Sequence, residues 1–152
     1  VYYPEYFKTI NRFTVPILFF KPNSEYVGVN KELAQQIDIY PTILDMIGYD
    51  KPFRSWGRSL VDKKHTTQPF VVNSLGNVHH YMKGNYICAF DGKNVIGFYA
   101  IDDKALEHNL IGQRNAEMTE LEIEAKAFYQ DYMNRVIDKK LTTVKWVQKR
   151  KY

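Results

Sequence analysis

Four short runs of alternating apolar residues between residues 69 and 102 place the strongest constraint on the fold of this chain. The runs are PFVVNSLG, VHHYMKG, NYICAFDG and NVIGFYAID, and a period of two is typical of strands with one buried face. Short segments containing Gly and Asn separate the runs at residues 76–77, 84–85 and 91–94, where tight hairpin turns would be needed. The sequence therefore predicts an antiparallel meander of about four strands.

Residues 117–138 return to helical spacing. A helix with one apolar face would bury that face, and the inner face of the meander, by lying on the sheet. We therefore expect a long helix packed on the four strands. Its apolar positions repeat at intervals of three and four: Met118, Leu121, Ala125, Phe128, Tyr132 and Val136.

The first part of the chain predicts a strand and a short helix. FTVPILFFKP, at residues 13–22, is a nearly continuous apolar run that favours a strand buried on both faces, with Pro16 near its start. Asp38 is placed to cap a following helix with its carboxylate, and Gly48 supplies a left-handed cap at the end of that helix. The helix would have one apolar face, formed by Ile39, Ile43, Met46 and Ile47.

A polar, turn-rich stretch at residues 51–68 predicts a surface connection, with Trp56, Leu60 and Val61 as anchors. The chain then divides into residues 1–68 and residues 69–152. At 152 residues and 45% apolar content, it can bury one ordinary core with a small subdomain.

Composition excludes some classes of protein. A single cysteine, Cys88, rules out an intrachain disulfide, and its apolar neighbours indicate a buried residue. No apolar run reaches the roughly 18 residues of a membrane span, and the start of the chain lacks signal-peptide features. Aromatic residues do not alternate with Lys and Arg, which disfavours nucleic acid as a partner. The net charge of +4 is concentrated near the end, which indicates a solvated tail or contact with anionic lipid headgroups.

No complete reaction centre emerges from the residues. His79 and His80 are adjacent, so on a strand they point to opposite faces and cannot chelate one ion together. Arg54 and Arg58 flank Trp56 in a loop and could bind an anionic group, although solvated arginines are the simpler interpretation. These four residues are the candidates for a pocket rim. We predict no catalytic residue and no metal ligand in this segment.

Other polar residues have simpler explanations. His65 and His108 lie in polar loops without a Cys or carboxylate at the spacing of zinc ligands. Asp102 and Asp103 are best explained as turn residues at the end of a strand.

The order of elements in the first half resembles the C-terminal part of the sulfatase-like catalytic domain of the alkaline phosphatase superfamily. That pattern is a V-P-apolar strand, then D-h-x-P-T-h-L-x-x-h-G with h apolar, then a G-x-S/D-L turn. RFTVPILFFKP, QQIDIYPTILDMIGYDKP and SWGRSL carry it here. The matching residues are Val15, Pro16, Asp38, Pro41, Thr42, Leu44, Gly48, Gly57, Ser59 and Leu60.

Two later stretches point to one branch of that superfamily. NYICAFDGKNVIGFYAIDDKALEHNLIG and AFYQDYMNRVIDKKL resemble the end of bacterial lipoteichoic acid synthases and phosphoglycerol transferases. The resemblance covers most of residues 10–140. It implies the terminal strand and helix of an alkaline-phosphatase-like α/β sheet, followed by the α+β subdomain of meander and helix.

The resemblance also implies what this segment lacks. Family members place the nucleophile, the acidic metal ligands and an Asp-His-Gly motif before the V-P strand, so none has a counterpart here. A divalent metal (Mn, Mg, Zn or Ca) is implied for the parent enzyme and no cofactor for this segment. Asp38 and Thr42 then serve as capping and first-turn residues of a packing helix.

The expected function is therefore that of a non-catalytic C-terminal fragment, with the upstream part of its own domain as partner. The parent would be a phosphoglycerol- or phosphoethanolamine-type transferase acting on a lipid or glycan substrate. It would lie in the extracytoplasmic part of a membrane-anchored bacterial protein. A sulfatase and an independent binding or structural module remain alternatives, and the fragment could dimerise through the exposed surface of its strand at residues 15–20.

Overall fold

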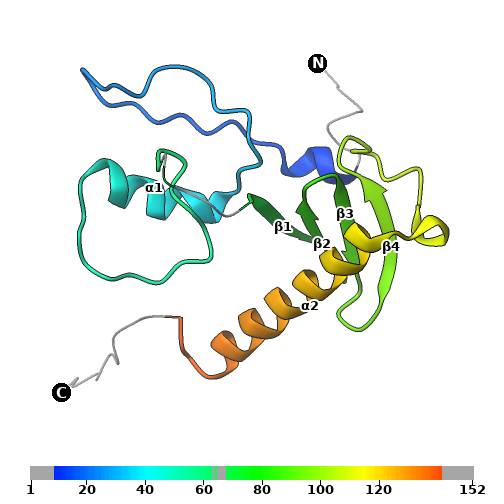
Figure 1. The fold of residues 1–152 in the computed structure, drawn as a ribbon. Helices are drawn as coiled ribbons and strands as arrows, with labels where there is room; N and C mark the ends of the chain where they lie inside the picture. Colours follow the sequence, from blue (N-terminus) through cyan, green and yellow to red (C-terminus); the bar gives the residue numbers. More distant parts are fainter. Residues whose placement is uncertain (1–8, 63, 65–67, 142–152) are drawn as a thin grey trace.

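The predicted meander is present as one antiparallel sheet in the computed structural model, which describes residues 9–62, 64 and 68–141. Its strands are β1 (Phe70–Leu75), β2 (Val78–Lys83), β3 (Tyr86–Phe90) and β4 (Val95–Ala100), in the order β1-β2-β3-β4. The turns contain Gly76, Gly84 and Gly92, all with positive φ, which glycine adopts without strain. The four-stranded meander is therefore confirmed, and with the helices it makes a mixed α+β fold (Figure 1).

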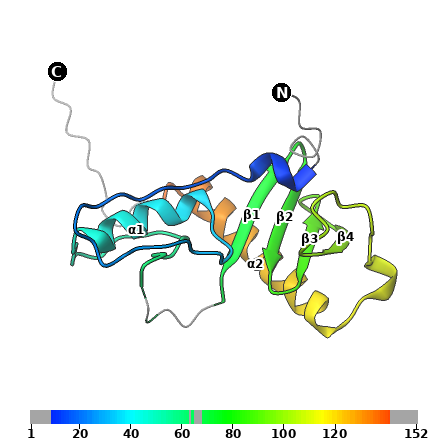
Figure 2. The same ribbon diagram turned by 90° about the horizontal axis from the view of Figure 1, so that it is seen from above.

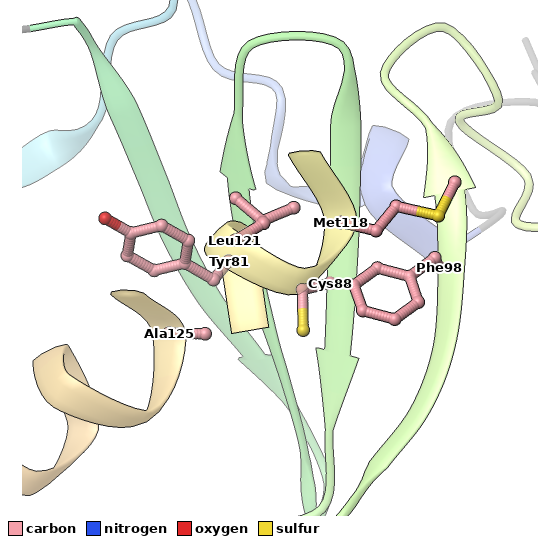
Figure 3. Close-up of a cluster of buried hydrophobic side chains, with 6 residues drawn as sticks. All are labelled: Tyr81, Cys88, Phe98, Met118, Leu121 and Ala125. Atoms are coloured by element: carbon pink, nitrogen blue, oxygen red, sulfur yellow. The ribbon is translucent and has the colours of Figure 1, made fainter. Parts of the chain in front are cut away.

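The long helix α2 (Ala116–Ile137) crosses one face of this sheet (Figure 1). Its N-terminus is capped by Asn115, whose side-chain oxygen accepts a 2.9 Å hydrogen bond from the amide of Met118. Figure 3 shows Met118, Leu121 and Ala125 of the helix beside the side chains of the strands. The packing of helix on meander is thus confirmed. This core consists of Tyr81, Cys88, Phe98, Met118, Leu121 and Ala125.

The opposite face of the sheet is covered by the start of the described chain and by the loop after β4. Ile10, in the 3-10 helix η2 (Thr9–Phe13), packs with Met82 and Ile87. Ile101 and Leu106 lie against this second cluster. The sheet therefore has a core on both faces, although the sequence predicted only the one beneath the helix.

The predicted strand at residues 13–22 is not formed. Residues 14–20 run without regular secondary structure past the short helix α1 (Ile39–Met46), as Figures 1 and 2 show. Leu18 is 90% exposed and Phe20 84% exposed. A strand buried on both faces needs a neighbouring strand and a covering layer, and the described chain offers this segment neither.

Helix α1 ends as predicted and begins differently. Gly48 has φ +70° and its amide bonds to the carbonyl of Asp45, which confirms the left-handed cap. Asp38 does not cap α1 with its carboxylate, so that prediction is wrong. The chain enters α1 through the 3-10 turn η3 (Gln36–Asp38), and Asp38 itself has helical φ and ψ (−78°, −17°). A side-chain cap instead requires an extended residue at this position.

The predicted apolar face of α1 is only partly covered. Ile43 is 45% exposed and Ile47 70% exposed, whereas Pro41 and Thr42 are buried. Ile39 and Met46 of the predicted face are half-buried, so the described chain covers Pro41 and Thr42 more completely than the apolar face.

Candidate functional site

A buried polar network joins the two motifs that carry the family resemblance. Asp38 is 2% exposed. One of its carboxylate oxygens accepts a 2.9 Å hydrogen bond from the amide of Gln35, and the other accepts one of 2.9 Å from the amide of Arg58. The carboxylate therefore connects η3 to a loop 20 residues further along the chain.

Thr42 makes the second connection. Its hydroxyl donates to the carbonyl of Asp38 at 2.6 Å and accepts from the amide of Leu60 at 3.0 Å. Between these contacts, a Cβ atom on Gly57 would lie 2.1 Å from the carbonyl oxygen of Ile37, so only glycine fits. The D-h-x-P-T and G-x-S-L motifs thus form one structural unit, in which both polar side chains are occupied by backbone groups.

An apolar groove lies between the C-terminal half of α2, the β1–β2 hairpin and the loop carrying Trp56. It has a volume of about 640 Å³ and mostly apolar walls. Its aromatic walls come from Trp56, Phe90, Phe128, Tyr129 and Tyr132.

His79 is one of the polar residues that line this groove. Its Nδ1 lies 2.7 Å from the hydroxyl of Ser74, and its ring lies 4.5 Å from the ring of Tyr129. Burial raises the pKa of Tyr129 to about 12, so its hydroxyl is neutral at physiological pH. Among the described residues no carboxylate is bonded to His79, so the Ser74–His79 pair lacks the orienting third group of a hydrolase triad.

His80 does not share this groove. It faces the opposite side of the sheet, is 3% exposed, and its Nδ1 lies 2.9 Å from the side-chain oxygen of Asn73. Burial, assisted by the charge of His79, lowers the pKa of His80 to about 4. The expectation that the two histidines point to opposite faces is confirmed, and His80 is a neutral core residue.

The side chains of the two candidate arginines bind different parts of the chain. Arg54 donates to the carbonyl of Lys140 at 2.6 Å, at the end of α2. Arg58 donates to Glu32 at 2.8 Å and to the carbonyl of Leu33 at 3.2 Å. Each guanidinium thus binds a group of its own chain, and the two do not form a shared anion pocket beside Trp56.

A smaller cavity of about 470 Å³ lies between the two halves of the chain and is lined partly by Arg58. It contains an ion pair between Lys83 and Glu124. Burial, and then the charge of Glu124, raises the pKa of Tyr81 well above its usual value. The second carboxylate oxygen of Glu124 is buried and has no hydrogen-bond partner among the described residues.

The remaining candidates are structural or lie outside the described residues. Cys88 is fully buried, and burial raises the pKa of its thiol to about 12, so it is no thiolate nucleophile. Asp103 accepts from the amides of Glu107 and His108, which confirms its role in a turn. His65 lies outside the described residues.

The described part of the chain contains no group of three or more His, Cys, Asp or Glu residues placed to hold a metal ion. Neither of its α-helices combines the length and the hydropathy that a membrane crossing requires.

Comparison with known proteins adds no relative. The chain matches no protein-family model, no curated protein sequence and no solved structure.

Proposed function

We propose that this chain is the non-catalytic closing segment of a larger metal-dependent enzyme of the sulfatase-like type, with a phosphoglycerol-type transferase as the preferred reaction. The observation that carries the proposal is a broad apolar surface left uncovered on the first half of the chain. Nine of its large apolar side chains are at least 45% exposed: Val15, Leu18, Phe20, Val27, Val29, Tyr40, Ile43, Ile47 and Tyr49.

These side chains are exposed although hydrogen bonds fix the backbone of the same region. The network of Asp38 and Thr42 holds α1 to the 57–60 loop, and the ammonium group of Lys21 donates to the carbonyl of Met46 at 3.1 Å. The apolar run thus passes beside the C-terminal end of α1, as a strand and its following helix would in an αβ layer. Large exposed apolar surfaces mark places where another protein surface packs.

The partner that fits this surface best is the upstream part of the same catalytic domain. An extended run that is apolar on both sides matches an inner strand of a parallel sheet better than it matches an edge. In this proposal the upstream part supplies the nucleophile and the divalent metal, as the resemblance to sulfatase-like enzymes implies. The present segment shapes the rim of the substrate pocket outside the cytoplasmic membrane.

A substitution test distinguishes a covered surface from an exposed one. In residues 1–152 alone, Leu18→Asp should leave the free energy of unfolding nearly unchanged, because Leu18 is 90% exposed. In a polypeptide extended to the full upstream reading frame, the same change should abolish folding or turnover. Ile123→Asp is the matched control, because Ile123 is 64% exposed on α2 and lies outside the proposed contact. Leu18→Asp that is harmless in both polypeptides would refute the proposal.

The reaction class is tested with substrates. The extended polypeptide should transfer phosphoglycerol from a lipid donor in the presence of a divalent metal and lose that activity with chelator. Turnover of an aryl sulfate instead would identify the sulfatase alternative. Residues 1–152 alone should turn over neither substrate, and metal-dependent turnover by this chain would contradict its non-catalytic role.

An independent binding module is the second candidate. The aromatic groove beside His79 favours it, because apolar grooves with a few polar groups are typical ligand sites. A module of this kind would be monomeric and would need no upstream partner. Dimerisation through the run at residues 15–20 is tested by sedimentation of the wild-type chain and of Leu18→Asp: a dimer of the wild type that the substitution dissociates would place the contact there.

A further inference from the structure

The C-terminal end of α2 carries an apolar surface that is separate from the one described above. The C-terminal end of α2, orange in Figure 1, extends beyond the sheet. We call the exposed apolar residues there the α2 patch. They are Tyr132 (40% exposed), Met133 (50%), Val136 (41%), Ile137 (69%) and, just after the helix, Leu141 (49%).

The patch occupies one side of the helix. At about 100° per residue, Tyr132, Val136, Met133 and Ile137 fall within an arc of roughly 140°. The polar residues of the same turns point to the other side: Asp131, Asn134 and Arg135. The last two turns of α2 are therefore amphipathic. Apart from the contact of Tyr132 with the Trp56 ring, their apolar side is largely open, whereas the sheet covers the earlier turns.

Positive charge is concentrated directly after the patch. Six of the chain's 21 Lys and Arg residues, and none of its 17 Asp and Glu, lie in residues 139–152. Because the whole chain carries +4, the other residues together carry −2. Of the two basic residues in the described part of this stretch, Lys140 is bonded to Asp138 at 2.7 Å.

We propose that the α2 patch and the basic residues 139–152 bind the surface of an anionic lipid bilayer. An amphipathic helix with basic residues lies in a bilayer interface with its apolar side among the acyl chains, while the cations contact anionic headgroups. Trp146 and Tyr152 add aromatic residues of the kind found at such interfaces. This binding does not depend on the enzymatic function proposed above.

Charge also favours a bilayer over a second copy of the chain. A two-fold dimer through this patch would bring two segments of charge +6 together, and their repulsion would oppose association. An anionic surface gains attraction from the same residues. The phosphates of a nucleic acid would attract the Lys and Arg residues, but they would leave the apolar side of the helix uncovered.

The test measures co-sedimentation of the full 152-residue chain with vesicles of phosphatidylcholine, with or without phosphatidylglycerol. We expect binding only to the vesicles containing phosphatidylglycerol, with affinity that falls as salt is raised. Lys139→Gln with Lys145→Gln should weaken binding about 25-fold, at about fivefold for each removed charge. Ile137→Glu should weaken it by a factor of about 30 or more, because it removes a buried apolar side chain and adds a negative charge.

Ile123→Glu is the matched control, since Ile123 is an exposed isoleucine of the same helix outside the α2 patch. It should leave vesicle binding unchanged, and circular dichroism should show that all variants keep the fold. Equal binding to neutral vesicles, no binding to either kind, or equal loss in both isoleucine variants would overturn the proposal. So would a dimer in solution that Ile137→Glu dissociates, because a second copy would then cover the patch.

Discussion

At the scale of single residues, the buried side chains Asp38 and Thr42 show how a short helix can be fixed to a loop without an extensive core. Each satisfies backbone amides that would otherwise be buried without a partner, which is costly. The chain thereby holds the 57–60 loop on α1 at a place where few apolar side chains are buried.

Replacing the hydroxyl of Thr42 tests this role. Thr42→Val keeps the shape of the side chain but leaves the amide of Leu60 without its acceptor, so we expect a loss of about 1–3 kcal/mol in the free energy of unfolding. Thr42→Ser retains the hydroxyl and should lose less. Urea denaturation of both variants measures the difference, and equal losses would show that the methyl group matters more than the hydrogen bonds.

His80 makes the stability of the protein depend on pH. Its pKa is about 4 in the folded chain and about 6.5 when unfolded, so between these values only the unfolded chain takes up a proton. Stability is therefore fully present above pH 6.5 and falls as the pH is lowered towards 4, with a limiting slope of about 1.4 kcal/mol per pH unit. His80→Gln should flatten this part of the profile, measured by urea unfolding at several pH values. An unchanged profile would mean that His80 is protonated in the folded chain.

Some residue roles follow from sequence and others depend on distant contacts. The opposite orientations of His79 and His80 follow from the two-residue period of a strand, and the buried Cys88 follows from its apolar neighbours. The partners of Asp38 do not, because the amide of Arg58 lies 20 residues away and no local pattern indicates it. Ser74 could have been found, since the hairpin at residues 76–77 places it opposite His79.

At the scale of elements, the sheet is closed at both edges by side-chain amides. The Gln35 side chain donates to the carbonyl of Phe70 and accepts from the amide of Val72 on β1. Asn109 makes the same pair of contacts with Ile96 and Phe98 on β4. Each carboxamide thus takes the place of a peptide group in a neighbouring strand and protects an edge from pairing with another chain.

Hydrogen exchange can test the two edges separately. Gln35→Ala removes the acceptor of the Val72 amide, so this amide should exchange about tenfold faster while that of Phe98 stays protected. Asn109→Ala should reverse the pattern, and each variant is the control for the other. Faster exchange at both edges in either variant would indicate general destabilisation of the sheet.

The success of prediction differed between elements for a physical reason. The strands of the meander pair with their sequence neighbours, so the period of two and the glycine turns were sufficient. The run at residues 13–22 has the composition of a strand, but a strand exists only where another strand pairs with it, and the described chain provides none. The contacts of Gln35 with the edge strand β1 were not predicted, because Gln35 lies 35 or more residues before the strand residues that it bonds to.

At the scale of the whole molecule, Trp56 is the main link between the first half of the chain and α2. Its indole N–H donates to Asp131 at 2.8 Å, and its ring lies 5.6 Å from the ring of Tyr132 and 6.1 Å from that of Phe128. The guanidinium of Arg135 lies 5.0 Å from the Trp56 ring. The α2–sheet core does not include Trp56, so this contact between the first half and α2 can be removed without opening that core.

Trp56→Ala should release the first half from α2 and leave the sheet folded. Loss of the ring contacts removes about 3 kcal/mol from this link. Limited proteolysis within residues 13–62 should become faster, while the amides of β2 and β3 keep their protection from hydrogen exchange. Trp56→Phe retains a ring but not the hydrogen bond to Asp131, and should fall between the two. If the strands lose protection together with residues 13–62, the chain unfolds as one cooperative unit, and the apolar surface of its first half is then held in place by the meander core.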